Sequence, residues 1–458
     1  MPAYIKKSNV WALAMHIAIA NFNFCYSLGV FNTCSDNVSF TLNWGSMKNT
    51  YIAIFSTMIP AGAFLSSLFA GYLLSKYGRR GSMIIADFVF ILGCLFSSLP
   101  YTFAFGLGRF LCGLGSGLFL TISPIYLNEI TPDSMVSQTG PLIQIFNSAA
   151  LIVAFGLGLM LPTENFNKSK LNGLWSFMFI FPGALALYQL VYFIFIMKFD
   201  SPKWYLDNGL RNKAYEALSY SYMPESINVG MMRFSIVRNE ADASEERLII
   251  SFKDIFTDKK YRKMLRIGIM LAIIQQLSGI NAAIFYSTEI FNRIGGNIAM
   301  ARIYTFIMGI ANMAAGMCTM PLLRKFGRKT LMISGQYALM FVCTLLGIFS
   351  EPVSVNSAFS LICVYLYIVF FTYSMAGTLW TYLGELCIDK ALAVATTVNL
   401  LFTCIITIAF PFAAIELGIS VVFFFFAGML LISIFYCHWD LIETKDKTKP
   451  EIMRLIFR

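Results

Sequence analysis

Long runs of apolar residues alternate with short polar segments along the whole chain. Each run has about 20 residues or more, the length that a helix needs to cross the hydrocarbon core of a membrane. The apolar residues are continuous within each run, which favours spanning helices over the alternating strands of a membrane β-barrel. Twelve runs qualify as spans: 9–31, 52–74, 82–102, 104–127, 139–161, 175–197, 264–291, 300–322, 330–350, 357–384, 391–412 and 419–438.

The composition agrees with this pattern. Of the 458 residues, 58% are hydrophobic and 13% are charged, whereas an average soluble domain contains about 25% charged residues. A disordered or disulfide-rich chain is therefore excluded. The ten cysteines are scattered without a CxxC motif, and His16 and His438 are the only histidines. We expect no metal site, no cofactor and no enzyme activity from such a set.

The basic residues are concentrated in alternate loops, which sets the expected orientation. The net charge of +10 follows the positive-inside rule when both termini are cytosolic, so it indicates a lipid bilayer as partner and not a nucleic acid. Two sequons, at Asn37 and Asn167, then fall in outside loops where glycosylation is chemically allowed. We expect a multi-pass glycoprotein of the plasma membrane. Its oligomeric state is left open.

The longest polar segment separates six expected spans from six. The sequence therefore predicts an N-terminal six-helix bundle (1–197), a cytosolic helical linker (198–263), a C-terminal six-helix bundle (264–440) and a cytosolic tail (441–458). Within the linker, helix-compatible pieces lie at about 207–219, 231–247 and 251–260.

The two halves of the chain repeat each other. GYLLSKYGRRGSMI at 71–84 matches MPLLRKFGRKTLMI at 320–333, and the Tyr126–Glu129 pair matches Tyr382–Glu385 at a similar offset. Two matches at similar offsets indicate duplication of a six-span unit. Duplicated transporter bundles often bind substrate between their halves and alternate access by rocking. Chance similarity of two short basic loops is the alternative.

Both repeated loops suggest a latch. Glu129 and Glu385 lie at helix ends near the basic loops, where ion pairs would bias a two-state transporter. The basic partners in this hypothesis are Arg79, Arg80, Arg328 and Lys329. The plainer interpretation is that these cations only fix the membrane orientation.

The seventh span contains an unusual set of amides. Gln275, Gln276, Ser278 and Asn281 interrupt an otherwise apolar run. Buried amides are unfavourable unless they are hydrogen-bonded. They can hold helices together, or they can bind a neutral polyol because they offer both donors and acceptors.

Together these motifs resemble the sugar porter family of the major facilitator superfamily. The resemblance covers essentially the whole chain and rests on GRR and GRK, RFLCGLGSG with PIYLNE, SPKW, QQLSGINAAIFYS, Trp380 with Glu385, and ETK at 443–445. It implies an all-α fold of twelve transmembrane helices in two pseudo-symmetric six-helix bundles.

The resemblance also implies the substrate site. In the family, the residues that match Gln275, Gln276 and Asn281 bind a hexose, and a matching tryptophan packs against the sugar. The substrate-binding set implied for this chain is Gln144, Gln275, Gln276, Asn281, Asn312, Trp380 and Asn399. For Trp380, simple apolar packing is the alternative.

The chain departs from the family pattern at several positions. The loop aspartate is Ser75 in the first half, and Arg324 takes its place in the second. A sugar-binding glutamate is Thr372, and the glycine-proline motif before the tryptophan is reduced to Gly377, Thr378 and Leu379. These changes weaken the latch hypothesis and leave the sugar preference open.

Acidic residues bear on the coupling mechanism, since proton symport needs a titratable group in the pathway. The position that is an aspartate in proton-coupled relatives is Ser27, and we expect no carboxylate in the middle of any span. The sequence thus predicts facilitated diffusion of a hexose, with glucose as the first candidate. A proton-coupled sugar or polyol symporter and a non-transporting sugar receptor are the alternatives.

Overall fold

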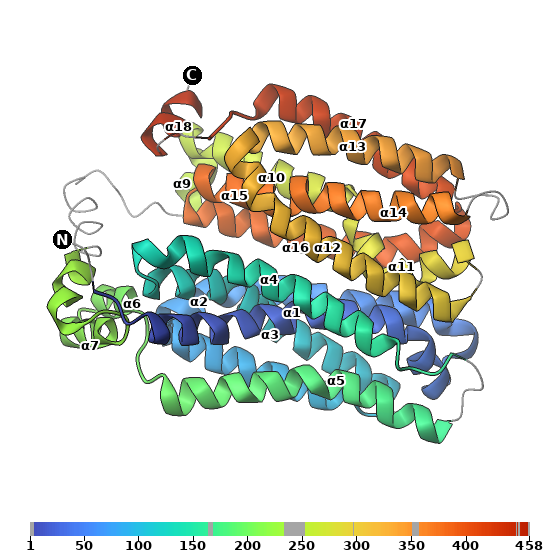
Figure 1. Ribbon diagram of the computed structural model, residues 1–458, viewed down its shortest axis with the longest axis horizontal. Helices are drawn as coiled ribbons and strands as arrows, with labels where there is room; N and C mark the ends of the chain where they lie inside the picture. Colours follow the sequence, from blue (N-terminus) through green and yellow to red (C-terminus); the bar gives the residue numbers. More distant parts are fainter. Residues whose placement is uncertain are drawn as a thin grey trace. The chain divides into compact units, whose positions relative to one another are not determined.

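The computed structural model describes residues 4–163, 168–232, 252–295, 297–349, 357–445, 447 and 449–456 (Figure 1). Within these ranges the secondary structure is helical, apart from one isolated bridge between Ile5 and Tyr222. Eleven helical segments of the described chain are long and apolar enough to cross a membrane. The predicted all-α membrane class is confirmed.

One of these segments accounts for two of the twelve expected spans. Helix α2 (Lys48–Ser97) has 50 residues, or about 75 Å of helix, against a hydrocarbon core of about 30 Å. It is interrupted at Gly78, where φ is 76° and ψ is −175°. The expected spans 52–74 and 82–102 are therefore the two parts of α2, before and after Gly78.

Two other spans are discontinuous. The seventh span consists of α10 (Lys259–Leu277) and α11 (Ile280–Gly295), separated at Gly279, where φ is 92°. The tenth consists of α14 (Ser357–Phe371), a π-helical turn η4 (Thr372–Ala376) and α15 (Gly377–Leu386). In both places the irregular backbone lies beside the residues expected to bind sugar, as is common in transporters.

The contacts between residues divide the chain into two compact units. The first contains residues 1–27, 61–150 and 176–251, and the second contains 28–60, 151–175 and 252–458. The ends of several helices of the first half thus belong to the second unit. This division differs from the predicted one, in which the linker separates the two halves.

The first unit is built from long helices and a small helical segment after them. Its long helices are most of α1 (Lys7–Thr41), α2 after residue 60, α3 (Thr102–Ile130), most of α4 (Asp133–Gly158) and most of α5 (Lys168–Val191). Small residues let α3 pack closely on α2, since a Cβ added at Gly115 would lie 2.8 Å from the Cβ of Phe90. Small residues commonly allow such close approach between helices in membranes.

The second unit contains the remaining spans. They are α10, α11, α12 (Ile298–Phe326), α13 (Arg328–Phe349), α14, α15, α16 (Asp389–Glu416) and α17 (Ile419–Asp440), followed by α18 (Lys449–Ile456). Helices α13 and α17 lie side by side, and α10 packs on α16 (Figure 1). The contact between α10 and α16 brings the amides of α10 within reach of α16.

The segment between the two sets of spans is helical where it is described. After a π-helical turn η2 (Tyr192–Ile196) it forms α6 (Pro202–Asp207), α7 (Arg211–Ser221), a short turn η3 (Pro224–Ser226) and α9 (Phe252–Thr257). The other short turn, η1 (Gly45–Met47), lies between α1 and α2. Most of the predicted piece 231–247 lies outside the described residues. Tyr4 packs on this segment, since its backbone N–H donates to Ser226 Oγ at 2.8 Å.

Candidate functional site

The amides of the seventh span form one connected network with α16. Asn399 Nδ2 donates to Gln275 Oε1 at 2.8 Å, and Gln276 Nε2 donates to Asn399 Oδ1 at 2.8 Å. Asn281 Nδ2 in turn donates to Gln276 Oε1. All four side chains are buried, with 5 to 7% exposure. The structure therefore brings together four of the seven residues that the sequence predicts for substrate binding.

The break between α10 and α11 sets this arrangement. Gly279 has φ of 92°, and an added Cβ would lie 2.5 Å from the ring of Phe426, so only glycine fits without a shift. Backbone groups freed at the break find other partners. Tyr367 Oη donates to the carbonyl oxygen of Ser278 at 2.9 Å, and Ser278 Oγ donates to that of Gln275 at 2.7 Å. The break thus places Gln276 and Asn281 on consecutive helices within bonding distance.

A second polar contact lies at the π-helical turn of the tenth span. Thr372 Oγ1 approaches Asn312 Oδ1 at 2.7 Å and the carbonyl oxygen of Ile368 at 2.7 Å. This π turn ends directly before Gly377, the glycine that remains of the family's glycine-proline motif. Trp380 follows in α15 with an intermediate exposure.

Gln144 has no hydrogen bond to these groups among those described. It belongs to α4 in the first unit, and its side chain is exposed. Its predicted role in sugar binding therefore stays a prediction.

The basic loop of the first unit is organised by two acidic residues. Arg79 Nη2 pairs with Glu129 Oε1 at 2.6 Å, and the two side chains are only 12% and 9% exposed. The guanidinium of Arg80 has no carboxylate partner among the described residues; its Nε donates to the carbonyl oxygens of Phe193 and Met197 at 2.8 and 2.5 Å. Arg80 therefore fastens the loop to the end of α5 and η2.

Asp200 is the second acidic residue of that loop. Its Oδ1 accepts the backbone N–H of Arg79 at 2.8 Å, and its Oδ2 accepts that of Arg80 at 2.9 Å. Burial raises the pKa of the Asp200 carboxyl above its usual value, and the backbone N–H groups of Ser201, Arg79 and Arg80 oppose that shift. Because both oxygens accept N–H groups, the geometry is that of a carboxylate.

The basic loop of the second unit repeats this pattern. Arg328 Nη2 pairs with Glu385 Oε1 at 2.6 Å, and Thr444 Oγ1 donates to Glu385 Oε2 at 2.6 Å. Lys329 Nζ donates to the carbonyl oxygen of Leu441 at 2.7 Å. Of the four predicted latch cations, Arg79 and Arg328 thus form ion pairs with the predicted glutamates, whereas the other two hold backbone carbonyl groups.

One expectation about acidic residues is wrong. Asp87 is 0% exposed and lies in α2 within the expected span 82–102, so a carboxylate is present inside a span. Neither of its oxygens has a hydrogen-bond partner among the described residues. The signal was available in the sequence, because Asp87 is the one acidic residue of that apolar run.

Two buried arginines show how this chain tolerates charge among apolar helices. Arg109 is 1% exposed, and its Nη1 donates to the carbonyl oxygen of Ser27 at 3.0 Å. Arg302 is also 1% exposed; it donates to the carbonyl oxygen of Leu161 at 2.7 Å and to the side chain of Asn37. Sequence reasoning missed the Arg302 contact, since no local pattern links residues so far apart.

The Asn37 contact bears on the expected glycosylation. Asn37 is 0% exposed, and its Nδ2 donates to the carbonyl oxygen of Pro162 at 3.2 Å. A side chain held in this way cannot bear a glycan in this structure. The second sequon asparagine, Asn167, lies outside the described residues.

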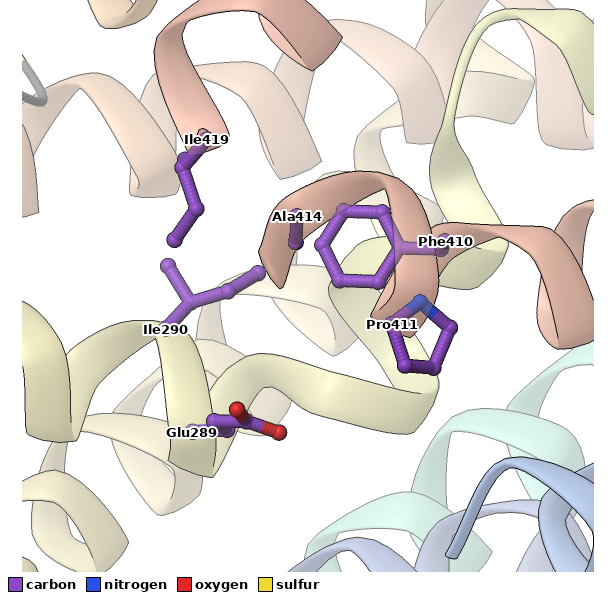
Figure 2. Close-up of a pocket in the computed structure, with 6 residues that line it drawn as sticks. All are labelled: Glu289, Ile290, Phe410, Pro411, Ala414 and Ile419. Carbon is purple, nitrogen blue, oxygen red and sulfur yellow. The ribbon is translucent and has the colours of Figure 1, made fainter. Parts of the chain in front are cut away.

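A small pocket near the end of α11 offers a different lining. It is lined by Glu289, Ile290, Phe410, Pro411, Ala414 and Ile419. Figure 2 shows the side chains of Ile290 and Ile419 pointing toward each other, with Glu289 to one side. An almost wholly apolar lining offers few partners for hydroxyl groups, so the amide network is the better candidate site.

The fold and this network define an integral membrane transporter and not an enzyme. The model of the family described as "Sugar (and other) transporter" matches residues 13–456, and the chain therefore belongs to this family of sugar porters. The predicted family and the twelve-helix fold are confirmed.

Known relatives cover nearly the whole chain. "Hexose transporter 1" of Plasmodium vivax is 27% identical over 96% of this chain and 91% of its own length. "Solute carrier family 2, facilitated glucose transporter member 3" of Canis lupus familiaris is 27% identical over 98% of this chain and 92% of its own length.

Solved structures show the same fold. The XylE proton:xylose symporter bound to 6-bromo-6-deoxy-D-glucose aligns with a TM-score of 0.79 at 21% identity, covering 98% of this chain and 99% of that one. The nucleoside transporter NupG is more distant, with a TM-score of 0.58 at 11% identity, and covers 93% of this chain and 98% of that one.

Proposed function

We propose that this protein moves a hexose, with glucose as the first candidate, down its concentration gradient by alternating access. The observation that supports this most is the network of Gln275, Gln276, Asn281 and Asn399. These groups are neutral and offer both donors and acceptors, which suits the hydroxyl groups of an uncharged sugar. The names of the relatives, a hexose transporter and a facilitated glucose transporter, agree with that choice.

Further residues complete the proposed binding site. Asn312 is held by Thr372 beside the π turn, and the partly exposed ring of Trp380 suits packing against the apolar face of a sugar. Gln144 is included on the family resemblance alone. The specificity among hexoses would depend on which hydroxyl each amide faces, because an unmatched buried polar group lowers affinity strongly.

The two ion pairs at the basic loops are proposed as gating elements. Arg79 with Glu129, and Arg328 with Glu385, are each partly buried and therefore contribute more than exposed surface pairs. Arg80 and Lys329 hold the same loops to neighbouring backbone. Such contacts, present in one state of the cycle and broken in another, would bias the balance between the two states.

Proton-coupled symport is the second candidate, and Asp87 favours it. A buried carboxylate inside a span is rare and is often part of a proton pathway. Against it, Ser27 replaces the aspartate of proton-coupled relatives, and no carboxylate bonds to the amide network within the described residues. We therefore favour uniport.

The decisive experiment is uptake of labelled D-glucose into liposomes that contain the purified protein, with and without an imposed pH gradient. Uniport gives saturable uptake that stops at equal concentrations and does not respond to the gradient. Accumulation above equilibrium that depends on the gradient would replace uniport by symport. A folded preparation that binds sugar but gives no uptake would point to the receptor alternative.

We also propose a plasma-membrane location with both termini in the cytosol. The placement of the basic loops supports this orientation under the positive-inside rule. Protease digestion of an N-terminal tag in intact and permeabilised cells tests it, since a cytosolic tag is cut only after permeabilisation.

A further inference from the structure

The four amides of the candidate site form a directed chain of hydrogen bonds, and the backbone fixes its direction at two places. Gln275 Nε2 donates to the carbonyl oxygen of Met375 at 2.9 Å. Asn399 Nδ2 donates to the carbonyl oxygen of Ala272 at 3.1 Å. A backbone carbonyl accepts hydrogen bonds and cannot donate them. Each of these two amides must therefore turn its NH2 group toward the backbone.

The remaining directions follow from these two anchors. Since Gln275 turns its nitrogen to Met375, its Oε1 faces Asn399, which donates to it. Since Asn399 uses its nitrogen for Ala272 and Gln275, its Oδ1 must accept from Gln276. Gln276 then turns its Oε1 to Asn281. Amide oxygen and nitrogen are hard to tell apart by shape, but here two independent carbonyl groups require the same order.

The count of bonds separates the four amides into two kinds. Both N–H groups of Asn399 are used, one for Gln275 Oε1 and one for the carbonyl oxygen of Ala272. Gln275, Gln276 and Asn281 each keep one N–H beyond the bonds described. Asn281 is the last amide in this series of hydrogen bonds, and its Oδ1 accepts no hydrogen bond from the described residues. Asn399 thus has no N–H group left to donate, whereas Asn281 Oδ1 accepts no bond at all from the described residues and is open to a donor.

We propose that Asn399 is a positioning residue, which orients the neighbouring amides and donates no hydrogen bond to the sugar. It fixes the direction of the Gln276 amide, and so makes Asn281 Oδ1 an acceptor that needs a hydroxyl donor from the sugar. This inference rests on the proposed hexose transport. It gives the site a polarity: at one carbon of the sugar the hydroxyl must donate a hydrogen bond, and a group that only accepts cannot replace it.

Sugars with one hydroxyl replaced test directly whether that hydroxyl must donate a hydrogen bond. A C–F group accepts weakly and does not donate, while a C–H group does neither. The test measures equilibrium binding of glucose, and of its deoxy and deoxyfluoro analogues at each carbon in turn, by calorimetry on the purified full chain. For the unmodified protein, we expect one carbon at which the fluoro analogue binds as weakly as the deoxy analogue, about 10-fold below glucose.

The variants Asn399→Ala and Asn399→Ser free the Gln276 amide to rotate, since neither side chain has an amide oxygen to accept its N–H, and Asn281 can then turn with it. We expect glucose to bind about 10-fold more weakly, and the ratio of glucose to fluoro-sugar affinity at that carbon to fall toward one. The ratio does not depend on the fraction of folded protein, so a merely structural defect leaves it unchanged. If one variant fails to fold, the other still gives the ratio.

Thr403→Val is the matched control. Thr403 lies one turn along α16 with the same 7% exposure as Asn399, and its hydroxyl donates to the backbone carbonyl of Asn399 at 2.9 Å. This variant should keep the unmodified ratio at every carbon.

Two results would overturn the inference and are distinct from failure of the proposed function. If the variants weaken glucose binding but keep the ratio, Asn399 does not set the polarity. If removal of one hydroxyl no longer matters in Asn399→Ala, then Asn399 bonds that hydroxyl itself. By contrast, unmodified protein that binds no hexose at all would refute the proposed function first.

Discussion

Asp200 and Glu443 occupy equivalent positions in the internal repeat, and each carboxylate binds the backbone of a basic loop. Asp200 accepts the N–H groups of Arg79 and Arg80 at 2.8 and 2.9 Å. Glu443 accepts those of Arg328 and Lys329 at 2.8 and 3.0 Å. Each carboxylate thus caps the helix that begins after a loop glycine, where free N–H groups favour a negative charge.

The first prediction concerns these caps. Asp200→Asn keeps the shape of the side chain but turns an NH2 group toward a backbone N–H group, because both oxygens of Asp200 already accept N–H groups. One buried bond is lost and a donor faces a donor, so we expect a loss of about 1–3 kcal/mol of stability. Thermal unfolding in detergent measures it.

The control for this change is Asp207→Asn. Asp207 lies at the end of α6 with an exposed side chain, and surface changes of this kind alter stability by about 0.5 kcal/mol or less. Equal unfolding temperatures for the two variants would show that Asp200 does not cap the loop. Glu443→Gln should repeat the effect in the second unit.

The second prediction concerns the loop glycines. Gly327 has φ of 85°, and an added Cβ would lie 2.7 Å from Glu443 Oε2. Gly327→Ala therefore combines an unfavourable left-handed backbone, at about 1–2 kcal/mol, with displacement of the capping carboxylate. Lower thermal stability and weaker transport are expected.

A helical glycine in the same repeat gives the opposite expectation. Gly71 lies inside α2, and an added Cβ would meet nothing within 4 Å. Gly71→Ala should therefore stabilise the helix by about 1 kcal/mol. If both substitutions acted alike, backbone conformation would not explain the glycine at position 327.

The third prediction compares two ion pairs by double-mutant cycles. Arg79 and Glu129 are 12% and 9% exposed and lie 2.6 Å apart, whereas Lys48 and Asp36 are 43% and 28% exposed at 2.5 Å. Water screens the second pair, so we expect a coupling below about 1 kcal/mol there and about 1.5–3 kcal/mol for the buried pair. Chemical denaturation of the single and double variants gives both values, and equal couplings would argue against a latch at Glu129.

The sequence predicts the helices of this protein better than the contacts between them. Span length and the repeated loops define the helices, the duplication and the glutamates 129 and 385, because these signals are local or repeat at a fixed offset. The amides of α10 stand out because polar groups are rare in a span. Their common partner, Asn399, is 123 residues beyond Gln276, and only the packing of α10 on α16 shows that it joins the two glutamines.

Long-range contacts explain what sequence reasoning missed. The pairing of Arg302 with Asn37 joins residues 265 positions apart, and nothing in either local segment indicates it. The same contact buries the sequon asparagine, which the sequence places in an outside loop. Asp87 is a different case, because its charge within an apolar run was visible and its burial followed from the span.

Contacts on either side of Asp87 show which part of α5 its helix faces at that level. On α2 it lies seven residues from both Arg80 and Cys94, and two helical turns separate each pair, so the three side chains share a face. Arg80 bonds to the carbonyl of Phe193, and Cys94 faces Gly183 on α5. Asp87 therefore lies at a level between those two contacts with α5, the helix that also contains Gln189. Gln189 is also 0% exposed, and neither of its amide atoms has a partner in the described chain.

The fourth prediction follows from this environment. Asp87→Asn preserves the shape of the side chain and removes a charge that has no cationic partner bonded to it, so the variant should be at least as stable as the unmodified protein. At any pH where the Asp87 carboxyl is ionised, we expect the variant to gain about 1 kcal/mol or more of stability. The same chemical change is thus expected to act in opposite directions at positions 87 and 200. A marked loss of stability in Asp87→Asn would mean that the negative charge itself is needed for folding.

Transport by the same variant separates uniport from symport. Under uniport, Asp87→Asn takes up glucose at close to the unmodified rate, and a pH gradient affects neither protein, because the carboxylate does not take part in the cycle. If the unmodified protein instead accumulates glucose against its gradient when a pH gradient is imposed, and Asp87→Asn only equilibrates it, then Asp87 binds the coupled proton. Initial rates and end-point levels in liposomes distinguish the two, since loss of coupling lowers the end point while equilibrative uptake continues.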